Sequence, residues 1–281
     1  MSNMTSAAIV LLGLVSASSC TDNKGDGGGA SGAPGSGGSS VGDANDREAD
    51  TDGGGVTAEA EAGEPVTILA PWDWAGVVGT GQSLAVGQMG MPAKANMQPY
   101  QNLKLSTGTA AWPIDPNDTS FRMVPLTEPI GRPSTAYPSG YPTNIAGETP
   151  HAAMANQITA LVMGAASKDY VTVHGEFGEN GQCLTFLVKN APQAPPNGRA
   201  YQATLLETQA VMRLAQAANK TYGVGAIIVT HGECDAGNAN YESGLYQLWS
   251  DYNADFATIT GQTQKALMIV SQQNAVNDRS A

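Results

Sequence analysis

The sequence predicts an α/β domain over residues 65–281, with a doubly wound, mainly parallel sheet flanked by helices. Three nearly continuous apolar and β-branched runs, YVTVH, GAIIVT and LMIVS, are typical of strands buried on both faces of a parallel sheet. Segments with helical patterning separate these runs. Strand–helix alternation is the pattern of doubly wound folds, in which helices cover both faces of the sheet.

Each expected element follows from its local pattern. Strands are expected over 66–69, 76–78, 170–174, 225–230 and 267–271, and helices over 151–166, 201–219 and 241–259. Thr149 and Pro150 mark the start of the first helix, because proline is favoured in the first helical turn. Residues 88–147 are rich in Pro, Gly, Tyr and Met without a clear period, so we expect an ordered insertion over one face of the sheet.

Residues 1–19 are expected to be a lipoprotein signal peptide. An apolar run, AAIVLLGLV at 7–15, precedes small residues and then Cys20, a pattern typical of export signals. The cysteine directly after small residues resembles the lipobox of bacterial lipoproteins, in which it is diacylated and becomes the new N-terminus. Thr21 in place of Asp then implies the outer membrane or cell surface. Ordinary secretion and a buried apolar N-terminus are the alternatives.

Residues 20–64 are expected to be a disordered linker rich in Gly, Ser and Asp. They hold 13 of the 34 glycines and no aromatic residue, so they cannot bury enough surface to offset their ordering entropy. Ten acidic and two basic residues give this segment −8 of the net charge of −12. The acidity therefore belongs mainly to the tether, and the chain lacks the basic surface of a nucleic-acid-binding protein.

Polar residues and glycines follow the expected strands, where parallel strands present their carboxyl ends to a ligand. The segment GTGQSLAVG follows the second expected strand and contains Ser83. Later strands are followed by HGEFGENGQ, with Gly178 and Gly181, by HGECDAGN, with His231, Glu233 and Asp235, and by QQN. These segments should meet at one edge of the sheet.

Two of these segments carry a family resemblance. GQS and HGECDA resemble the GQSN and QGESDA motifs of the SGNH-hydrolase superfamily, in its sialate O-acetylesterase and acetylxylan-esterase branch. The resemblance covers roughly residues 75–275 and implies a flavodoxin-like three-layer fold. It implies that Ser83 is the nucleophile of an ester hydrolase.

The resemblance also implies roles for the other strand-end residues. The oxyanion hole would comprise the N–H of Ser83, the N–H of Gly178 or Gly181, and His231, which stands where the branch has Gln. A structural role is the alternative for His231. Glu233 and Asp235 match an acidic pair expected to hold the loops together.

The catalytic base is the missing part of this resemblance. The family carries Asp and His as D-x-x-H near its C-terminus, but no histidine here follows an Asp by three residues, so the domain is expected to be incomplete at its C-terminus. The chain is then a truncated or frameshifted esterase, a pseudoenzyme that binds acylated glycan, or an enzyme using His231 or His174 as base. His174 is otherwise expected to be structural, and His151 to lie at the surface.

Cysteine placement indicates a disulfide. Besides Cys20, the chain has Cys183 and Cys234, an even pair in an exported domain, and each follows a strand end. We expect them to bridge the two loops; a nucleophilic Cys234 is the alternative. No His, Cys, Asp and Glu cluster has metal-ligand spacing, so neither a metal nor a cofactor is expected.

The sequence therefore predicts an exported, lipid-anchored serine esterase of the SGNH type that removes O-acetyl groups from carbohydrates and is inactive in this chain if the base is absent. The alternative is a non-catalytic surface lipoprotein that binds glycan or acts as a scaffold. An acetylated glycan is the expected partner, the membrane is contacted only through the lipid, and no nucleic acid is bound.

Overall fold

Four parallel strands form the centre of the sheet in the computed structural model, which describes residues 71–88, 90–107, 115–130, 147–166, 169–191 and 198–272. The strands are β1 (Trp74–Gly81), β2 (Leu103–Ser106), β3 (Arg122–Pro125), β4 (Val171–Glu176), β5 (Tyr222–His231) and β6 (Leu267–Gln272). Their order across the sheet is β3-β2-β4-β1-β5-β6. Only the β2–β3 pair is antiparallel among these strands.

The central position of β1 defines where a ligand would bind. After β1 the chain forms β2, β3 and β4 on one side of it and then crosses to β5 on the other side, so the strand order reverses between β1 and β5. The register places Gly79 beside Glu176 and Gly81 beside Thr230. The carboxyl ends of these strands therefore lie at one edge, next to the topological switch point at which doubly wound folds bind ligands.

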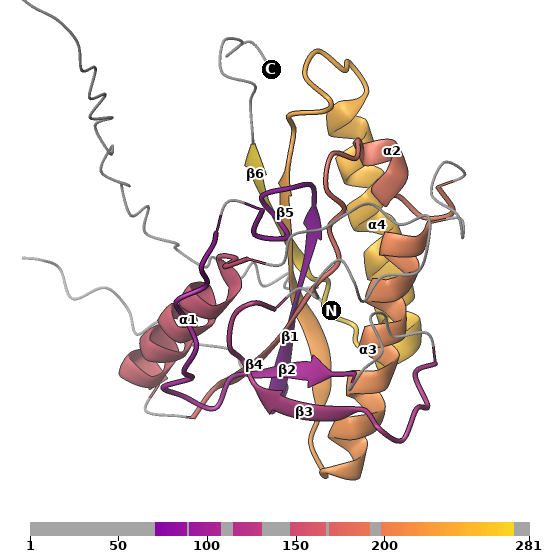
Figure 1. The fold of residues 1–281 in the computed structure, drawn as a ribbon. Coiled ribbons are helices and arrows are strands. Elements are labelled where there is room, and N and C mark those ends of the chain that lie inside the picture. The colour runs from indigo at the N-terminus through magenta and orange to yellow at the C-terminus, as the bar shows by residue number, and fades with distance from the viewer. Residues whose placement is uncertain are drawn as a thin grey trace, which may run out of the picture. The chain divides into compact units, whose positions relative to one another are not determined.

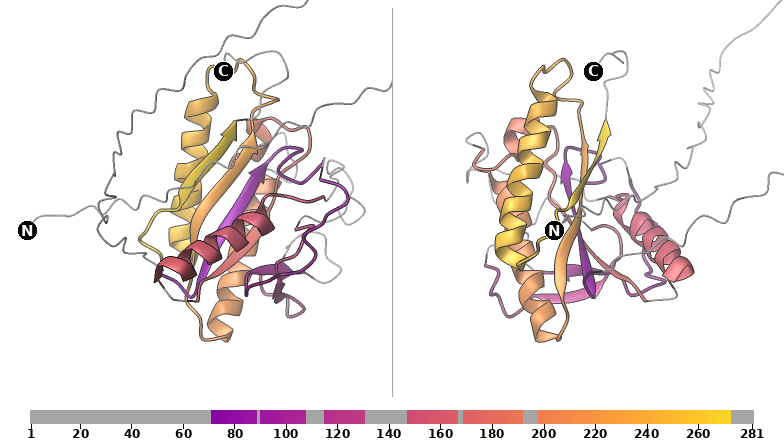
Figure 2. Two further views of the ribbon diagram at one scale, coloured as in Figure 1. Left: turned by 90° about the vertical axis from the view of Figure 1, so that its left-hand side faces the viewer. Right: turned by 180° about the vertical axis from the view of Figure 1, so that it is seen from behind.

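Helices cover both faces of this sheet. Helix α1 (His151–Ala166) lies on one face, and α2 (Leu184–Leu187), α3 (Arg199–Ala217) and α4 (Tyr241–Thr260) lie on the other, as the views in Figures 1 and 2 show. The Thr149 hydroxyl accepts the backbone N–H of His151 and so caps α1. Helix α4 ends at Gly261, whose φ of 74° is the left-handed conformation common after helices.

The main core lies between the sheet and helices α3 and α4. Tyr201 and Tyr252 stack with ring centroids 4.4 Å apart, and Phe256 stacks on Tyr252 in turn. Ile227 and Leu248 are fully buried in the same cluster. Each such side chain contributes about 1.5–3 kcal/mol to stability, so this face holds the sheet and its helices together. In a smaller cluster, Ala152 and Ala155 of α1 pack with Leu126, which follows β3.

Most of the expected elements form, together with two strands that were not expected. The predicted strands from 76–78 onward and the three predicted helices all fall on observed elements of the same type. The described part of 88–147, where no strand was expected, adds β2 and β3 to the edge of the sheet. The expected strand at 66–69, the signal peptide and the linker lie outside the described residues. Within the described residues, no helix is long and apolar enough to span a membrane.

Candidate active site at the carboxyl edge of the sheet

Ser83 lies on a tight turn directly after β1. Gly81 has a φ of 145° and passes so close to the carbonyl of Thr230 that a β-carbon would overlap it. Only glycine fits this position without strain. The chain then forms helical turns in which the N–H of Gln88 donates to the carbonyl of Ser83 at 2.9 Å. Ser83 is half-buried, and no group within the described ranges bonds its hydroxyl.

Gln82 ties this turn to the loop after β5. Its side chain is buried, its Nε2 donates to the Glu233 carboxylate, and its Oε1 accepts the N–H of Cys234 at 3.3 Å. Because Gln82 immediately precedes Ser83, these bonds fix the serine-bearing turn against the switch point. The sequence analysis did not predict a role for Gln82, although this residue stands within the GQS segment next to Ser83.

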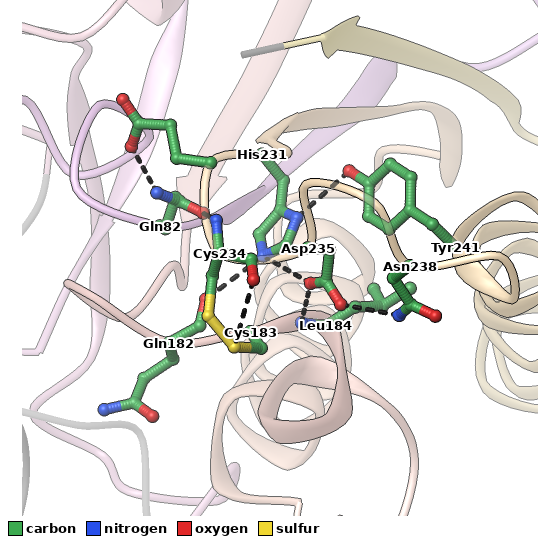
Figure 3. Close-up of a disulfide and its surroundings, with 10 residues drawn as sticks. Gln82, Gln182, Cys183, Leu184, His231, Cys234, Asp235, Asn238 and Tyr241 are labelled. Atoms are coloured by element: carbon green, nitrogen blue, oxygen red, sulfur yellow. Dashed lines mark hydrogen bonds and ion pairs between the residues drawn. A yellow bond between two sulfur atoms is a disulfide. The ribbon is translucent and has the colours of Figure 1, made fainter. Parts of the chain in front are cut away.

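A disulfide joins the loops that follow β4 and β5. Cys183 and Cys234 are bonded, with Cα atoms 5.0 Å apart (Figure 3). Asp235 strengthens the same junction, because its carboxylate accepts the N–H of Leu184 at 2.7 Å and the side-chain N–H of Asn238 at 2.8 Å. In the structure Glu233 and Asp235 thus hold loops together.

His231 is buried in this junction and both of its ring nitrogens are engaged. Nε2 lies 3.1 Å from the carbonyl of Gln182, and Nδ1 lies 3.0 Å from the hydroxyl of Tyr241 (Figure 3). A carbonyl only accepts, so Nε2 carries the hydrogen and Nδ1 accepts from Tyr241. Burial lowers the pKa of His231 and keeps the ring neutral. The oxyanion role expected for His231 therefore lacks a free N–H, and the residue supports the loops instead.

The two candidate glycines differ in their surroundings. Gly178 packs on the serine turn, where a β-carbon would lie 2.9 Å from the carbonyl oxygen of Gly81 and 3.0 Å from the β-carbon of Ala85. Its N–H donates to Glu176 at 2.7 Å and is therefore already engaged. Gly181 lies at an exposed turn with a φ of 71°, with open space where a side chain would project.

A buried ion pair anchors the loop that carries both glycines. The guanidinium of Arg199, at the start of α3, binds Glu179 through two hydrogen bonds of 2.6 and 2.7 Å. The two side chains are 5% and 1% exposed. This bidentate arrangement fixes the loop between β4 and α2 in both position and orientation.

The other two histidines are also buried, which corrects the expectation that His151 lies at the surface. His151 is 1% exposed, because α1 packs on β4 with this side chain turned inward. Its Nδ1 lies 2.9 Å from Nδ1 of His174, and its Nε2 lies 3.1 Å from Oε2 of Glu176. The second ring nitrogen of His174 bonds the Thr172 hydroxyl.

All six histidine ring nitrogens of the chain are therefore engaged with groups other than Ser83. The expectation that His231 or His174 acts as the base does not fit this arrangement. The structure also shows no group of three or more His, Cys, Asp or Glu side chains arranged to hold a metal ion within the described residues.

Fold and site together define an α/β protein that carries a serine on a turn at its topological switch point. No family model matches the chain, and no characterised protein matches its sequence. A solved structure of an Arabidopsis thaliana protein is similar with a TM-score of 0.45 and 12% identity, covering 74% of this chain and 89% of that chain. The structure of NanS is similar with a TM-score of 0.43 and 12% identity, covering 72% and 68%. Similarity at this level assigns no function.

Proposed function

We propose that this protein is an exported serine esterase of the SGNH type, with Ser83 as nucleophile and O-acetylated carbohydrates as substrates. One observation carries the proposal. The loops after β1, β4 and β5 converge around Ser83 and are held there by the bonds of Gln82, the disulfide and the packing of Gly178. A half-buried serine held from three strand ends, with no hydrogen bond to its hydroxyl among the described residues, supplies the nucleophile that acyl transfer needs.

The reaction would proceed through an acyl-enzyme. The Ser83 oxygen attacks the acetyl carbonyl carbon and its proton passes to a base, while the carbonyl oxygen becomes an oxyanion. Collapse of this intermediate breaks the ester bond, and the sugar oxygen leaves with a proton. Water then attacks the acetyl-serine, which releases acetate and restores the hydroxyl. The N–H of Ser83 is the oxyanion donor that this mechanism assigns to the serine turn.

Whether a general base is available to Ser83 distinguishes this function from a second candidate. Every ring nitrogen of the histidines within residues 1–281 is engaged elsewhere, so none of these histidines takes the proton of Ser83 in this arrangement. Loss of one member of a serine–histidine pair costs on the order of 10⁴–10⁶-fold in turnover. This observation favours a non-catalytic surface protein that binds acetylated glycan at the same edge.

An assay of the full chain separates the two candidates. Turnover of aryl acetates and acetylated sugars is measured for the wild type and for Ser83→Ala, and binding of an acetylated glycan is compared with binding of its deacetylated form. Turnover abolished by Ser83→Ala supports the esterase. Negligible turnover with acetyl-dependent binding that Ser83→Trp blocks supports the binding protein. Turnover unaffected by Ser83→Ala, or no preference for acetylated ligand, contradicts the assignment of this site.

We also propose export and lipid anchoring through Cys20, supported by the apolar run at 7–15 and the small residues before the cysteine. Intact-mass analysis of the protein from a bacterial envelope fraction should show a mature N-terminus at diacylated Cys20. Cys20→Ala should abolish this mass and release the protein from the membrane. A mature protein that retains Met1 would contradict the proposal.

A further inference from the structure

A chain of buried hydrogen bonds runs along the α1 face of β4 toward the Ser83 edge. It begins at Asn102, whose Oδ1 accepts both the backbone N–H and the hydroxyl of Thr172 at 2.9 Å. The backbone N–H identifies this amide atom as oxygen, so the Thr172 hydroxyl must donate to it. The hydroxyl oxygen therefore accepts from Nε2 of His174, 3.0 Å away.

The hydrogen bond between His174 and Thr172 determines which histidine donates in the hydrogen bond between His174 and His151. His174 is fully buried, and burial together with the nearby His151 lowers its pKa well below the usual value, so the ring is neutral. With its hydrogen on Nε2, Nδ1 of His174 can only accept, and Nδ1 of His151 must donate to it across 2.9 Å. Nε2 of His151 then faces Oε2 of Glu176 at 3.1 Å, and one proton lies between them.

The far end of the chain reaches the loop that supports the serine turn. The second carboxylate oxygen of Glu176 accepts the N–H of Gly178 at 2.7 Å. The next residue, Glu179, donates its N–H to the carbonyl of Gly81 at 2.8 Å. Gly79 permits this arrangement, because a β-carbon there would overlap both the Glu176 carboxylate and the His151 ring.

We propose that Glu176 is a positioning residue of the Ser83 site, oriented by His151, His174 and Thr172 so that its carboxylate holds the N–H of Gly178 and thereby seats the loop against the serine turn. The inference rests on the proposed function only in taking the Ser83 turn as a site. It gives a structural role to the buried residues Glu176, His151 and His174, none of which takes part in the proposed ester cleavage.

The surroundings of Glu176 make the link sensitive to pH. Glu128 lies near Glu176. The carboxylate of Glu128 packs against the start of α1, where it accepts hydrogen bonds from the Thr149 hydroxyl and the N–H of Ala152. From α4, the Tyr252 phenol interacts electrostatically with the same carboxylate. Burial raises the pKa of Glu176, the hydrogen bond and charge of His151 lower it, and Glu128 raises it further. As the pH is lowered, Glu176 therefore takes up a proton at a higher pH than an ordinary glutamate does. Protonation weakens the hydrogen bond that Glu176 accepts from the N–H of Gly178.

Nuclear magnetic resonance of the full chain with ¹⁵N-labelled histidine tests the direction of the chain. We expect His174 to carry its hydrogen on Nε2 and His151 to carry one on Nδ1, with a coupling between the two Nδ1 atoms across the hydrogen bond. A hydrogen on Nδ1 of His174, or the absence of that coupling, would overturn the proposal. Neither result depends on turnover, so failure here is distinct from failure of the esterase assignment.

Hydrogen exchange at the Gly178 amide tests the positioning role. We expect exchange at least about tenfold faster in Glu176→Ala, because a hydrogen bond to a charged group is lost. Glu176→Gln keeps an oxygen for Gly178 and an N–H for His151, so exchange should stay within about threefold of the wild type. Glu207→Ala is the matched control, because Glu207 is a buried carboxylate on α3 beside Gly175, whereas the N–H of Gly178 donates to Glu176.

The outcomes of this comparison are distinct. Fast exchange in Glu176→Ala, rescue by Gln and little change in Glu207→Ala support the proposal. Equal acceleration in the two alanine variants would overturn it, because it would show general loosening of the domain. If Glu176→Ala does not fold, the pH titration of the Gly178 amide shift decides. A titration above the usual range of a glutamate in the wild type, absent in Glu176→Gln, supports the proposal, and identical curves overturn it.

Discussion

Removing the carboxylate of Glu179 should strongly destabilise the domain. The bidentate pair with Arg199 has donor–acceptor distances of 2.6 and 2.7 Å and is almost fully buried. Glu179→Met leaves the guanidinium in the interior without this carboxylate, which costs about 3–5 kcal/mol. In a domain of this size about 2–4 °C of melting temperature accompanies each kcal/mol, so the melting temperature should fall by roughly 6–20 °C.

A double-mutant cycle measured by urea denaturation gives the assay. Arg199→Met should cost a similar amount, whereas the double variant should cost less than either single one, because neither charge is then buried alone. The matched control is Lys189→Met. Lys189 pairs with Asp255 at 2.9 Å, but its side chain is 36% exposed, so the loss should be under about 1 kcal/mol.

Two results would refute this reasoning. A cost below about 1 kcal/mol for Glu179→Met would mean that water reaches the pair in solution. Additive costs for Glu179→Met and Arg199→Met would mean that each side chain is stabilised by other groups. In either case the loop that carries Gly178 and Gly181 would owe its position to the disulfide and to packing.

Three further predictions concern the loops. His231→Gln should keep both hydrogen bonds and stay within about 1 kcal/mol of the wild-type stability at pH 7. Because folding lowers the pKa of His231, the unfolded wild type binds protons more readily than the folded protein below about pH 6.5, and its stability falls with pH. Urea melts at pH 5 should therefore show a smaller loss of unfolding free energy in the variant, by up to about 1.4 kcal/mol per pH unit. Parallel pH profiles would contradict this. Replacing Cys183 and Cys234, 51 residues apart, by Ser should cost up to about 4 kcal/mol through the entropy of the unfolded chain, and equal stability with and without reductant would count against it. Gly81→Ala should cost more than about 2 kcal/mol, against about 1 kcal/mol for Gly237→Ala, whose φ is also positive but whose surroundings are open; thermal melts showing equal costs would refute the crowding argument.

The sequence determines most of the fold because buried parallel strands and packed helices carry their own local signals. The strand over 225–230 is recognisable because both of its faces are apolar. The helix over 151–166 is recognisable from the Thr149–Pro150 start that precedes it. Strands β2 and β3 carry no such signal, because each has four residues, includes a basic side chain and owes its pairing to distant backbone.

Local sequence also determines that Ser83, the Gly178 loop and the His231 segment reach one edge, because parallel strands share their carboxyl ends. Only the tertiary structure decides what their side chains can do. His151 reads as a surface residue at a helix start, yet packing of α1 on β4 buries it against Glu176. The engagement of every histidine ring nitrogen depends on partners 2 to 49 residues away, and no local pattern in a single sequence encodes such contacts.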